Sequence, residues 1–179
     1  LHSSRDLWNG TIKFIFQPAE ERLPGGAKQM IAEGVLENPN VTNVIAQHVL
    51  PDLEVGKVGF RSGIYMASTD ELYINIKGIG GHAAIPSHYN NPILASSNLI
   101  LRLTDFFTSH KDSIFAIGYF QADGSTNVIP DQVKLMGTFR ALSEEYRKQS
   151  HIDMKSIVSD VEKKYNVRIE LDIRHGYPA

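Results

Sequence analysis

The chain has 179 residues, enough for one large domain or two small ones, and its 42% hydrophobic and 21% charged content is ordinary for a soluble globular protein. Its net charge of -2 shows no basic excess, and no apolar run approaches the roughly 20 residues that span a bilayer, so neither nucleic acid nor a membrane is expected as a partner. The absence of cysteine excludes a disulfide scaffold, a thiolate zinc site and a cysteine nucleophile. It is compatible with the cytoplasm, which is the location we expect.

The N-terminal region has the pattern of a parallel strand–helix–strand unit. Residues 11–16 form a short run of apolar, aromatic and β-branched side chains, which is typical of a buried strand. A helix is expected over 26–33, a second apolar strand over 44–46, and a third, glycine-punctuated strand over 55–60. The crossover of such a unit brings the carboxyl ends of its parallel strands to one edge of the sheet, where open α/β sheets bind ligands.

That edge would gather Glu20, Glu21 and His48. Two carboxylates and an imidazole suit a divalent metal, because one carboxylate and a neutral imidazole can ligate a zinc-like ion while the other carboxylate takes a proton from metal-bound water. The same residues also have a plain structural interpretation, as a solvated glutamate pair at a helix start and a hydrogen-bonded histidine at a strand end. Spacing alone leaves both interpretations open.

Beyond a boundary near residues 63–68, the pattern predicts a second domain. Apolar residues alternate with polar ones in strand-like segments, and two longer segments have helical periodicity. In chain order we expect a strand over 72–77, a helix over 92–107, strands over 114–120 and 133–141, a helix capped by Ser143, and a strand over 167–173. This βαββαβ order is the split-βαβ or ferredoxin-like arrangement, in which two helices cover one face of a four-stranded antiparallel sheet.

Three polar residues of the second domain are candidates for ligand contacts. His82 lies in a glycine-rich loop, Asn127 precedes a turn, and Arg140 lies on the strand face opposite Phe139. Each alone has an ordinary structural interpretation, but together they could bind a carboxylate or stabilise an oxyanion. The other histidines lie in polar surroundings without ligand spacing and are expected at the surface: His2, His88, His110, His151 and His175.

Five motifs occur in order along nearly the whole chain. The motifs are Phe16-Gln17-Pro18-Ala19-Glu20-Glu21, Gln47-His48, Gly80-Gly81-His82-Ala83-Ala84-Ile85-Pro86, Asn127-Val128-Ile129-Pro130 and Gly137-Thr138-Phe139-Arg140. Together they resemble the dinuclear metallo-amidohydrolases of the aminoacylase and carboxypeptidase superfamily, in particular its N-acyl-amino-acid amidohydrolases, hippurate hydrolases and auxin-conjugate hydrolases.

The resemblance implies a fold in which a catalytic α/β domain is interrupted by a ferredoxin-like lid that dimerises. On this interpretation residues 1–65 are part of the catalytic, metal-binding domain, 66–174 are the lid, and 175–179 return towards the catalytic domain. It also implies two divalent metal ions, zinc or manganese, with Glu21 and His48 among their ligands and Glu20 as the general base that deprotonates metal-bound water.

The same resemblance implies roles for the lid residues. His82 would reach the active site of a neighbouring subunit in a homodimer and steady the tetrahedral oxyanion. Asn127 and Arg140 would hold the substrate, a small N-acyl amino acid, with Arg140 on its carboxylate. Metal-activated hydroxide would then attack the amide carbonyl and release a carboxylic acid and an amino acid.

The chain also departs from the family pattern. The family draws further metal ligands from an upstream histidine-containing motif and from a histidine near the C-terminus, and this sequence contains neither. We therefore expect about half a dimetal site, and an incomplete, inactive fragment when the chain is alone. Two alternatives stay open: a non-catalytic oligomerisation module built on the lid, and a dipeptidase or carboxypeptidase of the same superfamily.

Overall fold

The computed structural model of the chain describes residues 1–20, 25–110 and 112–179. The chain divides into two units, Leu1–Phe60 and Arg61–Ala179, which are described separately below. Within the described residues, no helix combines the length and the apolar character that crossing a membrane requires.

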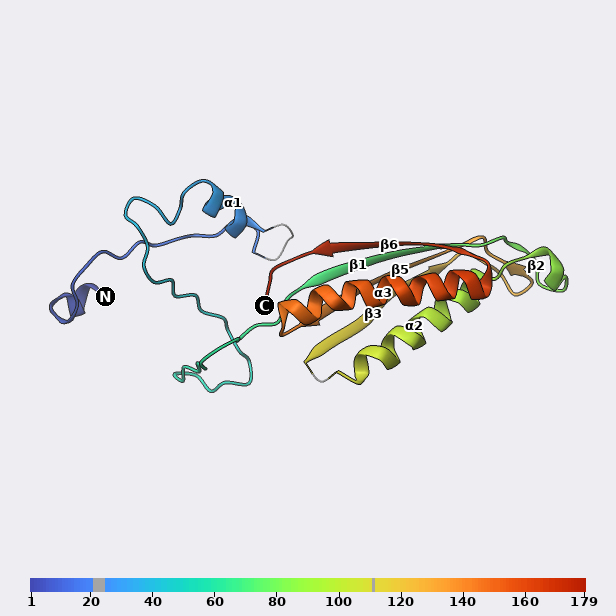
Figure 1. Cartoon of the computed structure of the whole chain (residues 1–179). Helices are drawn as coiled ribbons and strands as arrows, with labels where there is room; N and C mark the ends of the chain where they lie inside the picture. Colours follow the sequence, from blue (N-terminus) through green and yellow to red (C-terminus); the bar gives the residue numbers. More distant parts are fainter. Residues whose placement is uncertain (21–24, 111) are drawn as a thin grey trace. The chain divides into compact units, whose positions relative to one another are not determined.

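The second unit is built on a four-stranded antiparallel sheet with the strand order β3-β5-β1-β6. Two long helices lie against one face of this sheet (Figure 1). The main elements follow one another as strand, helix, strand, strand, helix, strand, and each lies where the sequence predicts one. They are β1 (Asp70–Lys77), α2 (Pro92–Thr108), β3 (Ser113–Ala122), β5 (Gln132–Ala141), α3 (Glu144–Tyr165) and β6 (Arg168–His175).

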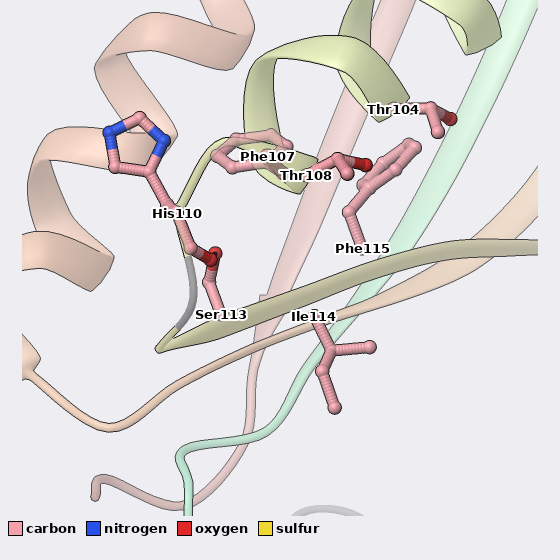
Figure 2. A pocket seen from close by; sticks show the side chains of 7 residues that line it. All are labelled: Thr104, Phe107, Thr108, His110, Ser113, Ile114 and Phe115. Atoms are coloured by element: carbon pink, nitrogen blue, oxygen red, sulfur yellow. Dashed lines mark hydrogen bonds between the residues drawn. The ribbon is translucent and has the colours of Figure 1, made fainter.

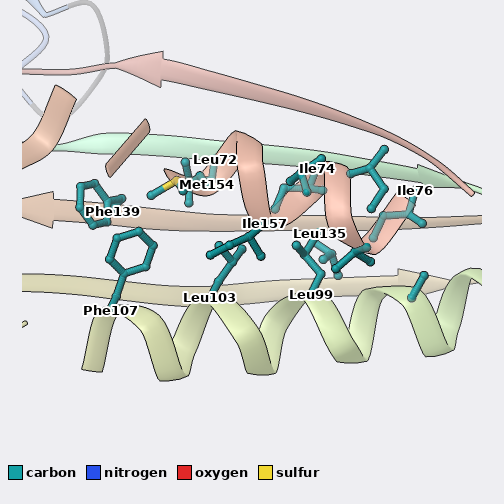
Figure 3. Packing of buried hydrophobic residues seen from close by; sticks show 14 of the residues in the cluster. Leu72, Ile74, Ile76, Leu99, Leu103, Phe107, Leu135, Phe139, Met154 and Ile157 are labelled. Atoms are coloured by element: carbon teal, nitrogen blue, oxygen red, sulfur yellow. The ribbon is translucent and has the colours of Figure 1, made fainter. Parts of the chain in front are cut away.

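The core of the second unit lies between the sheet and its two helices (Figure 3). Alternate residues of β1 are buried, as the period of two in its sequence predicts, and the same holds for much of β5. Full burial of each large apolar side chain stabilises the fold by about 1.5–3 kcal/mol relative to exposure. The largest fully buried apolar side chains are Leu72, Ile76, Leu99, Leu103, Phe107, Val133, Leu135, Phe139, Met154 and Val161.

The ends of the two long helices follow from local side chains. Asn91 Oδ1 accepts a hydrogen bond from the backbone nitrogen of Ile93 at 2.9 Å and so caps α2. Ser143 caps α3 as predicted, with its Oγ accepting from the nitrogen of Tyr146 at 3.2 Å. The helix ends at Tyr165, and the next residue, Asn166, has a left-handed φ of 50°, a conformation that asparagine tolerates better than most residues.

A small antiparallel pair of strands lies beyond one end of the sheet, and the sequence did not predict its strands. Strand β2 (Gly81–His82) pairs with β4 (Val128–Ile129), and a short 3-10 helix, η2 (Pro86–His88), follows β2. Gly80 allows the close approach, because a Cβ at this position would lie 2.7 Å from the carbonyl oxygen of Ile129. This β2–β4 pair brings together two loops that are 45 residues apart.

The first unit differs from the prediction. Its described residues contain the 3-10 helix η1 (His2–Leu7) and the helix α1 (Gly26–Ala32), which agrees with the predicted helix, but no strand. The strands predicted over 11–16, 44–46 and 55–60 are therefore wrong for these residues.

The exposure of the same segments gives the physical reason. Phe16 is 85% and Ile45 96% exposed, and Gly26 is the only buried residue among 1–20 and 25–60. Parallel strands are stable when neighbouring strands satisfy their backbone and both faces of the sheet are covered. Neither condition is met within the described residues of this unit, so the apolar segments form no strand and stay largely exposed.

Candidate functional site

Two of the residues predicted for catalysis and metal binding lie in the first unit. Glu20 and His48 are both exposed. Nδ1 of His48 lies 2.7 Å from the carbonyl oxygen of Val49, so this nitrogen can donate to the carbonyl and leave Nε2 as the free ligand atom. Glu21, the other predicted metal ligand, lies outside the described residues.

The donor types of this region suit a divalent cation, since carboxylate oxygen and imidazole nitrogen both bind zinc and manganese. In the part of the chain that the structure describes, however, no three His, Cys, Asp or Glu side chains come close enough to hold a metal ion. The described residues, which do not include Glu21, therefore do not assemble a metal centre by themselves, and the predicted half-site stays a prediction.

His82 and Asn127 come together at the β2–β4 pair, His82 in β2 and Asn127 directly before β4. The nitrogen of Ala83 donates to the carbonyl oxygen of Asn127 at 2.9 Å. The nitrogen of Ala84 donates to Nδ1 of His82 at 3.2 Å, which assigns the acceptor role to Nδ1 and the proton to Nε2 of the neutral ring. Oδ1 of Asn127 accepts from Ser125 Oγ at 3.0 Å, so its amide nitrogen is the side-chain group left to donate. Both side chains thus offer N–H donors, which suit an oxyanion or a carboxylate.

Arg140 lies far from the β2–β4 pair. It is exposed near the end of β5, opposite Ile114 of β3. The β2–β4 pair lies beyond the start of β5, where Gly78 N donates to Asp131 O at 2.8 Å (Figure 1). Eight residues from Gln132 to Arg140 at about 3.3 Å each separate the two regions by roughly 26 Å. The structure brings His82 and Asn127 together, but it does not bring Arg140 to them.

A buried ionic cluster in the second unit was missed by the sequence reasoning. Asp70, which is 1% exposed, accepts from Arg147 Nε at 2.9 Å through Oδ2 and from Arg147 Nη2 through Oδ1. Nε2 of His151 lies 2.7 Å from Oδ2 of the same carboxylate. Because β1 supplies Asp70 and α3 supplies both partners, the cluster ties the sheet to the helix.

His151 therefore corrects a prediction, since it was expected at the surface and is only 8% exposed. His2, His88, His110 and His175 are exposed, as expected. A signal was present in the sequence: Arg147 and His151 extend the apolar stripe of α3 backwards, seven and three residues before the buried Met154.

The electrostatics of the cluster favour the ionised carboxylate. Burial by itself raises the pKa of Asp70, but the hydrogen bonds from Arg147 and His151, together with their charges, outweigh it and hold the pKa below its ordinary value of 3.8. The hydrogen bond to Asp70 likewise raises the pKa of Arg147. The pair is therefore fully ionised at neutral pH.

A pocket of about 310 Å³ lies between the end of α2 and the start of β3 (Figure 2). Among the described lining residues, His110 is the titratable group, and its Nδ1 lies 3.0 Å from Ser109 Oγ. None of the predicted site residues that the structure describes lines this pocket. The lining residues are Thr104, Phe107, Thr108, His110, Ser113, Ile114 and Phe115.

Comparison with known proteins tests the resemblance that the motifs indicate. The chain matches the model of peptidase family M20/M25/M40 over residues 1–179. It belongs to this family. Two members with which it can be compared are the N-acetylcysteine deacetylase of Bacillus subtilis (strain 168), 37% identical over 95% of this chain, and the N-acyl-L-amino acid amidohydrolase of Geobacillus stearothermophilus, 33% identical over 97%. The chain spans 45% and 47% of the lengths of these two M20/M25/M40 relatives.

Solved structures of M20-type proteins agree with this assignment. A putative aminohydrolase from methicillin-resistant Staphylococcus aureus superposes with a TM-score of 0.83 at 33% identity, covering 91% of this chain and 44% of that one. A peptidase of family M20 from Bacillus subtilis, described as dinuclear metal binding, superposes with a TM-score of 0.70 at 32% identity, covering 91% and 40%. The resemblance read from the motifs is confirmed, and the mixed α/β fold is similar to that of the family.

Proposed function

We propose that this chain is part of a metal-dependent amidohydrolase that cleaves the amide bond of N-acyl amino acids to a carboxylic acid and an amino acid. Its M20/M25/M40 relatives include a deacetylase and an amidohydrolase named for such substrates. The observation that carries the proposal is the pairing of β2 with β4, which brings together Nε2 of His82 and the side-chain amide of Asn127, both available as N–H donors to a ligand. Amide hydrolysis develops negative charge on the carbonyl oxygen, which such donors stabilise.

The first unit would supply the proton transfer and part of the metal site. Glu20 would accept a proton from the attacking water, and Glu21 and His48 would hold divalent metal, zinc or manganese, together with ligands from the rest of the full-length protein. Bound metal supplies Lewis acidity that activates water and polarises the amide carbonyl.

The second unit would act as a lid with a ferredoxin-like fold, and its residues would serve two copies. The separation of Arg140 from His82 and Asn127 by roughly 26 Å is longer than an N-acyl amino acid, so one copy cannot hold a single substrate with all three. In a homodimer, His82 and Asn127 of one copy would act on a substrate whose carboxylate is bound by Arg140 of the other. The unpaired edge of β3, with Ile114 60% exposed, offers a surface for a second copy.

Hydrolysis of N-acetyl and N-benzoyl amino acids by the full-length protein tests the proposed reaction. We expect release of amino acid that stops on removal of metal, and a fall in kcat of about 10²–10⁴-fold for Glu20→Gln, because general acid–base catalysis contributes this much. Glu33→Gln, which changes an exposed carboxylate of the same unit, is the matched control. A loss below about tenfold for Glu20→Gln would remove the base assignment. Faster cleavage of dipeptides than of N-acyl amino acids would favour a dipeptidase instead.

Mixing two inactive variants tests the shared site. Neither Glu20→Gln nor His82→Ala should be active alone. After subunit exchange, half of the dimers contain one subunit of each variant. Each mixed dimer has two sites, one of which combines an intact Glu20 with an intact His82 from the other subunit. We expect recovery of about a quarter of the wild-type activity. No recovery, or a monomer in sedimentation at micromolar concentration, would contradict the proposal. A stable dimer that never hydrolyses amides would instead favour a non-catalytic oligomerisation module.

A further inference from the structure

Two segments of the second unit lie side by side where β1 begins and β6 ends. We call residues 68–70 and 175–177 together the neck. Thr69 N donates to Tyr177 O at 3.0 Å, Gly176 N donates to Thr69 O at 2.8 Å, and Tyr177 N donates to Thr69 Oγ1 at 3.1 Å. A Cβ on Gly176 would lie 2.3 Å from Thr69 O, so this contact requires glycine. The neck is therefore a closely paired ribbon.

The neck is fixed to β5 on both sides of Arg140. Ser68 N donates to Ala141 O at 2.8 Å, and Ala141 N donates to Ser68 Oγ at 3.1 Å. On the other side, Thr138 Oγ1 donates to the backbone oxygen of Asp70 at 3.2 Å. Arg140 is exposed, but its neighbour Ala141 is fully buried. The backbone from which the Arg140 side chain extends is thus held by the neck.

The Asp70 side chain fastens the neck to α3. Its two oxygens bind Arg147 and His151, and Arg147 Nη1 also donates to Glu144 at 3.1 Å. Because its carboxylate is fully buried, Asp70 cannot contact a substrate itself. Any effect of Asp70 on binding must pass through the residues that it holds.

We propose that Asp70 is a positioning residue that fixes Arg140 for recognition of the substrate carboxylate. The inference rests on the proposed function of Arg140. A guanidinium binds a carboxylate through two parallel hydrogen bonds, so its placement has to be accurate to about 0.5 Å. Asp70→Asn removes the buried anionic partner of Arg147 and leaves it only the half-buried Glu144, which loosens the junction of β1, β5 and α3 beside Arg140.

A double-mutant cycle in the full-length protein tests this coupling. Asp70→Asn should raise KM for an N-acyl amino acid about tenfold and change kcat less than about twofold, the size expected from weakening one charge-assisted contact. In an Arg140→Ala background, the same substitution should change KM less than about twofold, because Asp70 acts through Arg140. If the increases in KM from Asp70→Asn and Arg140→Ala multiply in the double variant, Asp70 has a general structural role and the proposal is overturned. Glu144→Gln, which changes the half-buried partner of Arg147, is the control and should leave KM unchanged.

Amide hydrogen exchange on the 179-residue chain gives a readout that needs no catalysis. In Asp70→Asn, the amides of Ala141 and Tyr177 should exchange at least about tenfold faster, while those of Ile79 and Asn90 at the far end of the unit stay unchanged. Unchanged protection at Ala141 overturns the proposal even if the protein is an amidohydrolase. If the full-length protein hydrolyses no amide, the exchange result still decides whether Asp70 fixes the Arg140 segment. If Asp70→Asn does not fold, His151→Gln, which keeps a donor near Asp70, should show the same pattern with smaller shifts.

Discussion

The two units use similar apolar segments in different ways. Every buried hydrophobic side chain in the described residues lies in the second unit, from Leu72 to Ile169. The first unit has comparable apolar runs, but residues such as Phe16 and Ile45 face solvent. The difference shows that apolar content alone does not make a core.

What separates the two units is where the partners of each strand are found. All four strands of the antiparallel sheet and both covering helices lie within residues 70–175, so the second unit supplies its own hydrogen-bond partners and its own cover. A parallel sheet needs neighbours on both sides and cover on both faces, and the described residues 1–20 and 25–60 supply neither. We propose that the exposed segments of the first unit pair with strands from the rest of the full-length protein.

Amide exchange should show the largest contrast between the units. The central strands β1 and β5 open only with the whole core, so their amides should exchange at least about 10³-fold more slowly than those of residues 11–16 and 44–46. Mass spectrometry of the exchanging 179-residue chain measures this directly. Equal protection in both regions would mean that the first unit holds a core of its own.

A matched pair of substitutions sharpens the same contrast. Leu72→Ala removes a fully buried side chain and should lower the free energy of unfolding by about 2–5 kcal/mol, because it leaves a cavity. Phe16→Ala removes a larger but exposed side chain and should change it by less than about 0.5 kcal/mol. Urea unfolding of the chain measures both, and a large loss for Phe16→Ala would contradict the contrast.

The smallest expected effect is a pH dependence confined to the second unit. The pKa of Asp70 is lowered in the folded state, so its ion pair stabilises the fold fully above the unfolded pKa, near 3.8, and the stabilisation is lost as the pH falls through the lower folded pKa. The melting temperature should therefore fall between about pH 5 and pH 2, and less steeply in Asp70→Asn. Equal slopes for the two proteins would exclude Asp70 as the cause.

The sequence predicts the elements of the second unit well because their signals are local. The alternation in residues 72–77 and the stripe from Met154 to Val161 need no information from elsewhere in the chain. The strand pattern of residues 11–16 is just as clear, but whether a strand forms depends on neighbours that no local pattern contains. The role of His151 was missed for a related reason, since its partner Asp70 is 81 residues away.

The candidate site could be predicted only in part. The motifs identify His82, Asn127 and Arg140 as residues of interest. His82 and Asn127 come together only through the pairing of β2 with β4, and these two-residue strands are too short to leave a periodic signal in the sequence. The distance of Arg140 from the β2–β4 pair, by contrast, follows from the length of β5. The positions of Glu20 and His48 relative to a metal depend on residues that are distant from them in the sequence, which no local pattern can place.

The closely paired neck has a consequence for protein engineering. Thr69 and Gly176, which lie just before β1 and just after β6, are joined by a backbone hydrogen bond, so the segment between them can be inserted into a single tight turn of a host protein without stretching it. Recombination can therefore exchange this segment as a cassette, with the junctions placed at two adjacent points of the backbone.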